Sequence, residues 1–158
     1  MSELGNEIAK SAEARIGRPF RHHFKPVNLC EGGKRTVDEC MERGMDDLEG
    51  YDCSGLVIAS LCEALHISTS QWPRELRHTQ QLAELAVDKE FEPGDIRLYY
   101  SHNNRIHLGI ATSTEQAIHA SGLTNAVERS IVVDPSGSFE ATRVIAAQSL
   151  FATLKNRI

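Results

Sequence analysis

Cys53 is the residue of this chain with the clearest capacity for chemistry, and it lies in the stretch YDCSGLV at residues 51–57. The apolar run that begins at Leu56 has the spacing of one helix face, which predicts a helix over residues 53–65 with Cys53 at its start. A helix N-terminus carries partial positive charge and free N–H groups, which favour a thiolate and can hold a developing oxyanion. Cys53 is therefore a candidate nucleophile, and a buried, unreactive cysteine is the alternative.

A thiol nucleophile needs an imidazole within hydrogen-bond reach and a polar group that fixes the tautomer of that imidazole. His107 lies in the predicted strand IHLGIAT, and His119 lies in the next predicted strand, AIHA. Their separation of 12 residues (119 − 107) suits two short antiparallel strands joined by a turn. Because side chains alternate between the faces of a sheet, both imidazoles are expected on one face, and the two histidines are predicted to form a site with Cys53.

Two other interpretations of these residues stay open. A single histidine between apolar neighbours is commonly a core residue whose polar atoms are satisfied. Cys53, His107 and His119 together could also ligate zinc, although no fourth ligand or catalytic glutamate is evident beside them. Of the other histidines, three are expected to be exposed and two lie in a long loop and are not placed: His66, His78 and His102, then His22 and His23.

Helices are predicted in the first part of the chain and strands in the second. Apolar residues recur four apart from Leu4 to Ile16, which predicts an amphipathic helix over residues 3–16, with Ser2 as its N-cap and Gly17 at its end. Residues 20–50 are expected to form a long loop, and after Trp72-Pro73 a helical pattern runs from Leu76 to about Leu85. Strands are predicted over residues 96–100, 106–112, 117–120 and 127–133, and residues 144–151 form a last strand or a terminal helix. This order is the α+β layout.

The composition is that of a soluble globular protein with one domain, spanning residues 1–158. The net charge of −5 lacks the basic footprint that binding of nucleic acid requires. No apolar run approaches the roughly 20 residues that span a bilayer, and no Sec-type signal is visible, so a cytoplasmic location after synthesis is expected. Four cysteines without a C-x-x-C pair do not form a disulfide framework, although Cys30 and Cys40 could form a bridge outside the cytoplasm.

Several motifs, taken in order, resemble the NlpC/P60 family of cysteine peptidases. They are DCSGLV at residues 52–57, P-R-x-x-x-x-x-Q at residues 73–80, PGD at residues 93–95, H-x-G-I at residues 107–110 and IHA at residues 118–120. The resemblance extends from about Ala9 to about Val133, and AEARIGRPF is similar to the family's opening helix and turn.

The resemblance implies a papain-like α+β fold, in which N-terminal helices pack on an antiparallel sheet of about five strands. It implies Cys53 as nucleophile, His107 as general base and His119 as the residue that orients His107. Asp52 and Ser54 match positions near the free amino group of the substrate. The substrate class it implies is the stem peptide of bacterial peptidoglycan, cut between D-glutamate and the following diamino acid through an acyl-enzyme, without a metal or other cofactor.

The sequence departs from the family pattern before the nucleophile. Phe20 stands where the family usually has a tyrosine whose hydroxyl assists at the oxyanion, and Tyr51 is a candidate replacement. RHHF replaces the usual Gly-Gly, and the long loop at residues 20–50 exceeds the usual connection. A protein without a visible signal would reach the wall by non-Sec delivery, as a phage-tail component or a secreted effector, or would act on recycled wall peptides inside the cell. An immunity or assembly partner and the oligomeric state are left open.

The leading hypothesis is thus a cysteine endopeptidase of peptidoglycan stem peptides. Hydrolysis or acyl transfer on another amide or lipid substrate by the same three residues is one alternative. A non-catalytic binding module of the same fold is the other, and it predicts an unreactive Cys53.

Overall fold

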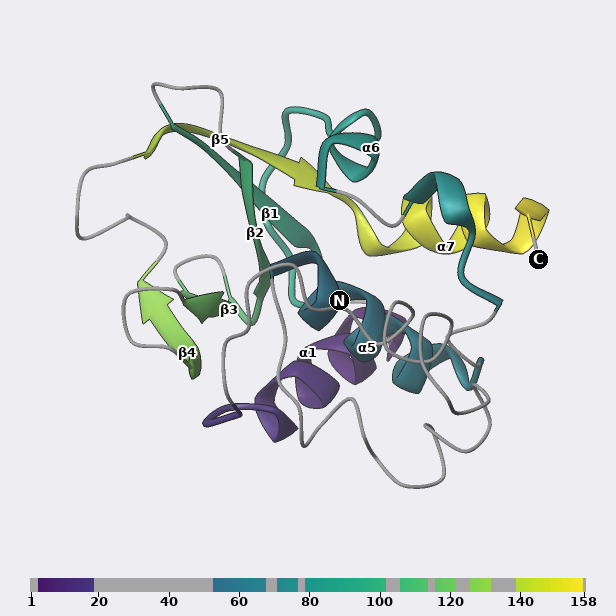
Figure 1. The fold of residues 1–158 in the computed structure, drawn as a ribbon, viewed down its shortest axis with the longest axis horizontal. Helices are drawn as coiled ribbons and strands as arrows, with labels where there is room; N and C mark the ends of the chain where they lie inside the picture. The colour runs from purple at the N-terminus through teal and green to yellow at the C-terminus, as the bar shows by residue number, and fades with distance from the viewer. Residues whose placement is uncertain are drawn as a thin grey trace, which may run out of the picture.

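An antiparallel sheet with helices beside it makes up the part of the chain that the structure describes (Figure 1). This computed structural model describes residues 3–18, 53–67, 71–76, 79–101, 106–113, 116–121, 126–131 and 139–157. The helices are α1 (Glu3–Ala14), α5 (Cys53–Leu65), the 3-10 helix η2 (Arg74–Leu76), α6 (Thr79–Ala83) and α7 (Ala147–Arg157). The strands are β1 (Ile96–Ser101), β2 (Ile106–Ala111), β3 (Gln116–Ser121), β4 (Ala126–Ile131) and β5 (Phe139–Ile145), in the sheet order β4-β3-β2-β1-β5.

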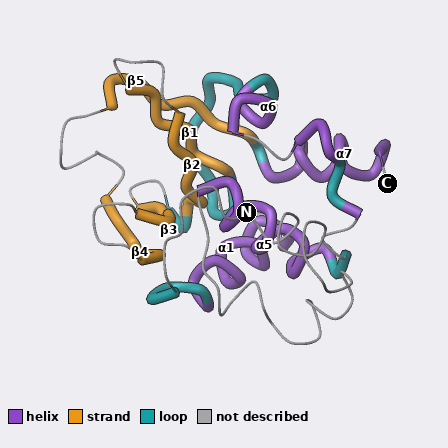
Figure 2. Tube along the Cα trace, viewed as in Figure 1, coloured by secondary structure: helices purple, strands orange, loops and turns teal. Residues whose placement is uncertain are grey.

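One face of the sheet packs against the two long helices of the first half of the chain. Figures 1 and 2 show α1 and α5 lying together next to the sheet, and α5 contacts both β2 and β3. In the register, Leu98 pairs with Leu108 and Ile110 pairs with Ile118, so these apolar side chains share one face. They form a single core with apolar side chains of the helices: Ile8, Ala12, Leu56, Val57, Ile58 and Leu61. The other face of β1, β2 and β3 is therefore left for polar side chains.

The α+β papain-like class predicted from the sequence is confirmed, and α5 begins at Cys53 as predicted. The C-terminal segment contains both alternatives, since β5 ends at Ile145 and α7 begins at Ala147. The helix predicted up to residue 85 is wrong in its extent, because the described residues of this segment form the 3-10 helix η2 and the short α6, which ends at Ala83. In this segment Trp72 is buried and donates a hydrogen bond from Nε1 to the Leu76 carbonyl at 2.9 Å, which closes a tight turn. Ser2 and the predicted loop at residues 20–50, with Cys30 and Cys40, lie outside the described residues.

The turn at Gly94 and Asp95 joins the sheet to two helices. The buried Asp95 carboxylate accepts hydrogen bonds from the Ala147 amide at 3.0 Å, the Glu92 amide at 3.0 Å and the Lys89 ammonium at 3.2 Å. Ala147 is the first residue of α7, so Asp95 satisfies a free N–H group at that helix start. Gly94 has φ of +89°, and a Cβ atom there would overlap the backbone of Gly5 in α1. The PGD motif is thus explained by a close approach of two backbones and a helix cap.

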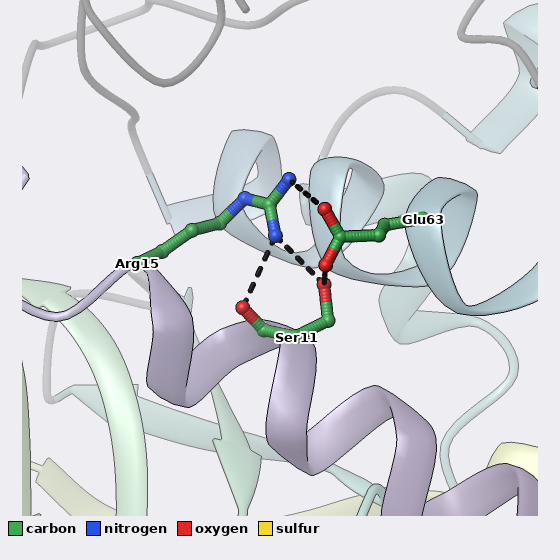
Figure 3. A network of polar contacts seen from close by, with 3 residues as sticks. All are labelled: Ser11, Arg15 and Glu63. Carbon is green, nitrogen blue, oxygen red and sulfur yellow. Dashed lines mark hydrogen bonds and ion pairs between the residues drawn. The ribbon is translucent and has the colours of Figure 1, made fainter.

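A polar network fixes α5 against α1 (Figure 3). The Arg15 guanidinium donates from Nη1 to Ser11 Oγ at 2.7 Å and lies 3.2 Å from Glu63 Oε2 through Nη2. Ser11 Oγ donates to Glu63 Oε1 at 2.8 Å. Burial alone would raise the pKa of Glu63, but the hydrogen bonds from Arg15 and Ser11 and the Arg15 charge outweigh it, so the pKa of this carboxyl lies below its usual 4.5.

Gly94→Ala should destabilise the protein far more than Gly17→Ala. Gly17 has a similar φ of +93°, but a Cβ atom there meets nothing within 4 Å, so it measures the backbone strain alone. We expect the free energy of unfolding to fall by about 1 kcal/mol in Gly17→Ala. In Gly94→Ala we expect it to fall by about 3 kcal/mol or more, because overlap with the backbone of Gly5 adds to the backbone strain. Urea denaturation of both variants measures the difference, and equal losses would contradict the role given to the Gly5 contact.

Glu63→Gln should lower the free energy of unfolding at pH 7 by about 1 kcal/mol, a modest value because the carboxylate is partly in solvent. Since the pKa of Glu63 is lowered in the folded state, its contribution is present above the unfolded pKa and is lost as the pH falls through the folded value. The difference between variant and wild type should therefore shrink as the pH falls below about 4. Denaturation at pH 7, 5 and 3 tests this.

Glu7→Gln is the matched control, because the Glu7 carboxylate lies 3.7 Å from Lys10 on an exposed face of α1, the helix that carries Ser11. It should change the free energy of unfolding by less than about 0.5 kcal/mol at every pH. A pH-independent loss in Glu63→Gln would count against the ionic part of the network.

Candidate active site

Cys53 opens α5, and its partly buried thiol faces a second helix start. Its Sγ lies 3.7 Å from Oγ1 of Thr79, the first residue of α6, and either group could be the donor. A hydroxyl at this distance can donate to a thiolate and thus stabilise the reactive form. Thr79 could not be identified from the sequence, because its approach to Cys53 depends on the path of the 25 residues between positions 53 and 79 rather than on any local pattern.

His107 and His119 meet on the polar face of the sheet. Nε2 of His107 lies 2.8 Å from Nδ1 of His119, and the ring planes are 81° apart with centroids at 5.0 Å. In the register of β2 and β3, Ile110 pairs with Ile118 and Ala111 with Ala117. One further antiparallel step places His119 opposite Gly109, with His107 on the adjoining diagonal. The two imidazoles therefore lie next to each other on one face of the sheet, as predicted from the sequence.

Gly109 makes room for this pair. A Cβ atom at Gly109 would lie 3.3 Å from the Ile118 carbonyl oxygen and 3.5 Å from His119 Cβ. Contacts of 3.3 Å are tighter than ordinary van der Waals contact, so a side chain here would push the two strands apart or displace His119. The glycine of the H-x-G-I motif therefore serves the position of His119.

An aromatic and cationic stack supports His107 from β1. Tyr99 pairs with His107 in the register, their ring centroids lie 5.9 Å apart, and Tyr99 is buried. The buried Arg97 guanidinium lies 4.0 Å from the centroid of the Phe91 ring and 5.3 Å from that of Tyr99. Burial lowers the pKa of Arg97 from its ordinary value, against the raising influence of Tyr99. This packing restricts the movement of Tyr99, which in turn limits the positions open to His107.

The structure describes two of the other candidate residues, Ser54 and His66. Ser54 is buried in the first turn of α5, and its contact with a substrate stays a prediction. His66 is exposed, as predicted. Tyr51 and Asp52, predicted to bind substrate, lie outside the described residues, as do Phe20, His22, His23, His78 and His102.

The described residues also bear on a metal site and on a membrane-spanning helix. Within them, no group of three or more His, Cys, Asp or Glu side chains is arranged to hold a metal ion. None of the helices resolved in this part of the chain is long and apolar enough to cross a membrane. What the site offers is a thiol at a helix start and a pair of hydrogen-bonded imidazoles, the groups of thiol acyl-transfer chemistry.

Comparison with known proteins gives consistent matches. The model of the NlpC/P60 family matches residues 32–147. The Escherichia coli K12 protein named "Probable endopeptidase NlpC" is 32% identical over 74 residues, which are 46% of this chain and 46% of that protein.

Solved structures show the same fold at low sequence identity. The P60 domain of an antigen from Mycobacterium avium subspecies paratuberculosis has a TM-score of 0.61 at 17% identity, over 92% of this chain and 95% of that domain. The peptidoglycan hydrolase RipB from Mycobacterium tuberculosis has a TM-score of 0.61 at 19% identity, over 92% of this chain and 65% of that protein. At these identities the structures establish the architecture.

Thr79→Val should slow alkylation of Cys53 by iodoacetamide at pH 7 about fivefold, because the isosteric valine removes a hydrogen bond worth about 1 kcal/mol to the thiolate. Thr79→Ser keeps the hydroxyl and should react at the wild-type rate. Mass spectrometry of the Cys53 peptide follows the reaction separately from the other cysteines. Equal rates in Thr79→Val and wild type would show that the hydroxyl does not stabilise the reactive sulfur.

Proposed function

The chain belongs to the NlpC/P60 family, and on that premise we propose that it is a cysteine peptidase that hydrolyses amide bonds in peptidoglycan stem peptides. The observation that carries the proposal is the 2.8 Å hydrogen bond between His107 and His119, combined with Cys53 at the start of α5. Relatives named as an endopeptidase and as a peptidoglycan hydrolase support the substrate class.

In the proposed mechanism, Cys53 is the nucleophile and His107 is the general base. Nδ1 of His107 takes the thiol proton while its Nε2–H donates to Nδ1 of His119, which orients the ring. The thiolate attacks the carbonyl carbon of the scissile amide, and the negative charge that develops on the oxygen is held by the free N–H groups at the start of α5.

The tetrahedral intermediate then breaks its C–N bond. The amine leaves with the proton from His107, and the acyl group remains as a thioester on Cys53. A water molecule gives a proton to His107 and attacks the thioester carbonyl, which releases the acid and restores the thiol. Every proton taken by His107 is returned, so the cycle needs no metal ion and no redox partner.

The proposed bond joins D-glutamate to the following diamino acid. The carboxylate of Asp52, directly before the nucleophile, would attract the free amino group of such a peptide, with Ser54 and Tyr51 as further candidates for substrate contact. Tyr51 would also supply the hydroxyl that Phe20 lacks.

Incubation of the purified protein with muropeptides, followed by mass spectrometry, tests this function. Wild type should release a fragment that ends in D-glutamate and a fragment with a new amino terminus on the diamino acid. Cys53→Ala should lower the rate by more than about 1000-fold, since nucleophile removal abolishes the covalent route. His107→Ala should lower the rate of cleavage by a similar factor.

Cys62→Ala is the matched control, because Cys62 is a buried cysteine in the same helix. It should retain activity. A folded wild-type protein that leaves muropeptides intact would contradict the substrate assignment. If its Cys53 also alkylates like an ordinary thiol across the pH range, a binding module becomes the better description, whereas a reactive Cys53 would favour amide hydrolysis or acyl transfer on another substrate.

A further inference from the structure

Glu128 lies behind His119, on the side away from His107. In the register of β3 and β4, His119 and Glu128 are direct partners, so their side chains project from the same face. Oε1 of Glu128 lies 3.4 Å from Nε2 of His119, with the two side chains 35% and 17% exposed. Three adjacent strands thus contribute one residue each to a row on the polar face: His107 from β2, His119 from β3 and Glu128 from β4.

The neighbouring charge on β4 is directed elsewhere. Arg129 follows Glu128 in the strand and therefore projects from the opposite face. Its Nη2 lies 3.1 Å from Oε1 of Glu13, at the end of α1. The charge of Arg129 is thus engaged by Glu13 rather than by the carboxylate beside His119.

The row of three side chains has a consequence for the position of protons. A neutral imidazole carries one proton, on either Nδ1 or Nε2, and a carboxylate can only accept. The Glu128 contact of 3.4 Å is an ion-pair distance and not a hydrogen bond, but a negative charge so near Nε2 still favours the tautomer with the proton on that nitrogen. Nδ1 of His119 then has its lone pair directed at His107.

The tautomer of His119 determines the tautomer of His107 through the 2.8 Å hydrogen bond between the two rings. With Nδ1 of His119 as acceptor, Nε2 of His107 must be the donor, and its Nδ1 is left as the basic nitrogen. The opposite tautomer of His119 would place a proton on its Nδ1 and require Nε2 of His107 to accept. His107 would then carry its proton on Nδ1, where it could not take one from a thiol.

We propose that Glu128 is a positioning residue that sets the tautomer of His119 and, through it, the basic nitrogen of His107. The effect on catalysis rests on the proposed function, whereas the tautomer assignment does not. Nothing in the sequence marks Glu128 for this role, since it stands in an ordinary alternating strand, VERS.

Long-range ¹H–¹⁵N spectra of the histidine side chains at neutral pH test the tautomers directly. Wild type should show His107 and His119 each with the proton on Nε2. Glu128→Gln keeps the shape but replaces the charge with an amide that can also donate, so the Nδ1–H form of both histidines should become populated. Glu13→Gln is the matched control, since it removes a carboxylate, 44% exposed, that pairs with the adjacent residue of β4, and it should leave both tautomers unchanged.

Kinetics supply the second measurement. Glu128→Gln should lower both kcat for muropeptide cleavage and the alkylation rate of Cys53 about tenfold, the size seen when the partner of an oriented histidine is removed, with KM unchanged. Unaltered tautomers in Glu128→Gln, or equal losses in Glu13→Gln, would overturn the proposal. If wild type cleaves no muropeptide but Glu128→Gln still shifts the tautomers and slows alkylation, the substrate assignment fails and the role of Glu128 stands.

Discussion

The turn at Gly94 and Asp95 is the constraint on which the rest of the described structure depends. The Gly94 amide donates to the Ala111 carbonyl at 2.7 Å, and the Ala111 amide donates to the Asp95 carbonyl at 2.8 Å, which fixes how β1 begins against the end of β2. The Asp95 carboxylate meanwhile binds the first amide of α7, and the backbone of Gly94 lies against α1. Two helices and the central pair of strands are therefore positioned by two adjacent residues.

The register of β1 and β2, which is set at this turn, also decides on which face of the sheet the histidines lie. Because side chains alternate with a period of two, a slip of one residue between β1 and β2 would move His107 to the apolar face and bring Leu108 to the polar one. The same holds for β2 and β3, where Gly109 permits the close pairing that brings His119 to His107. The hydrogen bond between the imidazoles is thus a product of strand register, and the apolar residues on the opposite face make any other register costly.

Local patterns explain what could be predicted from the sequence. Cys53 at the start of α5 followed from an unbroken apolar run, and the pairing of His107 with His119 followed from two short strands with strict alternation. The interruption of the predicted helix before α6, the approach of Thr79 to Cys53 and the pairing of Glu128 with His119 could not be predicted in this way. The interruption follows from the buried Trp72, which closes a turn onto the Leu76 carbonyl. The other two features depend on how distant segments meet, and Glu128 was indistinguishable in sequence from an ordinary strand glutamate. The expectations for Tyr51, Asp52 and residues 20–50 fall on parts of the chain that the structure does not describe.

The proposed site therefore combines two halves that are stabilised by different means. The thiol is on a helix that is fixed to α1 by the Ser11–Arg15–Glu63 network, whose partly exposed ion pair contributes little energy but has a defined geometry. The imidazoles are on strands whose register follows from buried apolar pairs and from the Gly94–Asp95 turn. Because α5 packs directly on β2 and β3 through the same core, a change in either half that leaves this core intact should alter reactivity more than stability. The polar face of the sheet can consequently vary around a constant fold, which is consistent with an architecture shared at under 20% identity with the compared structures.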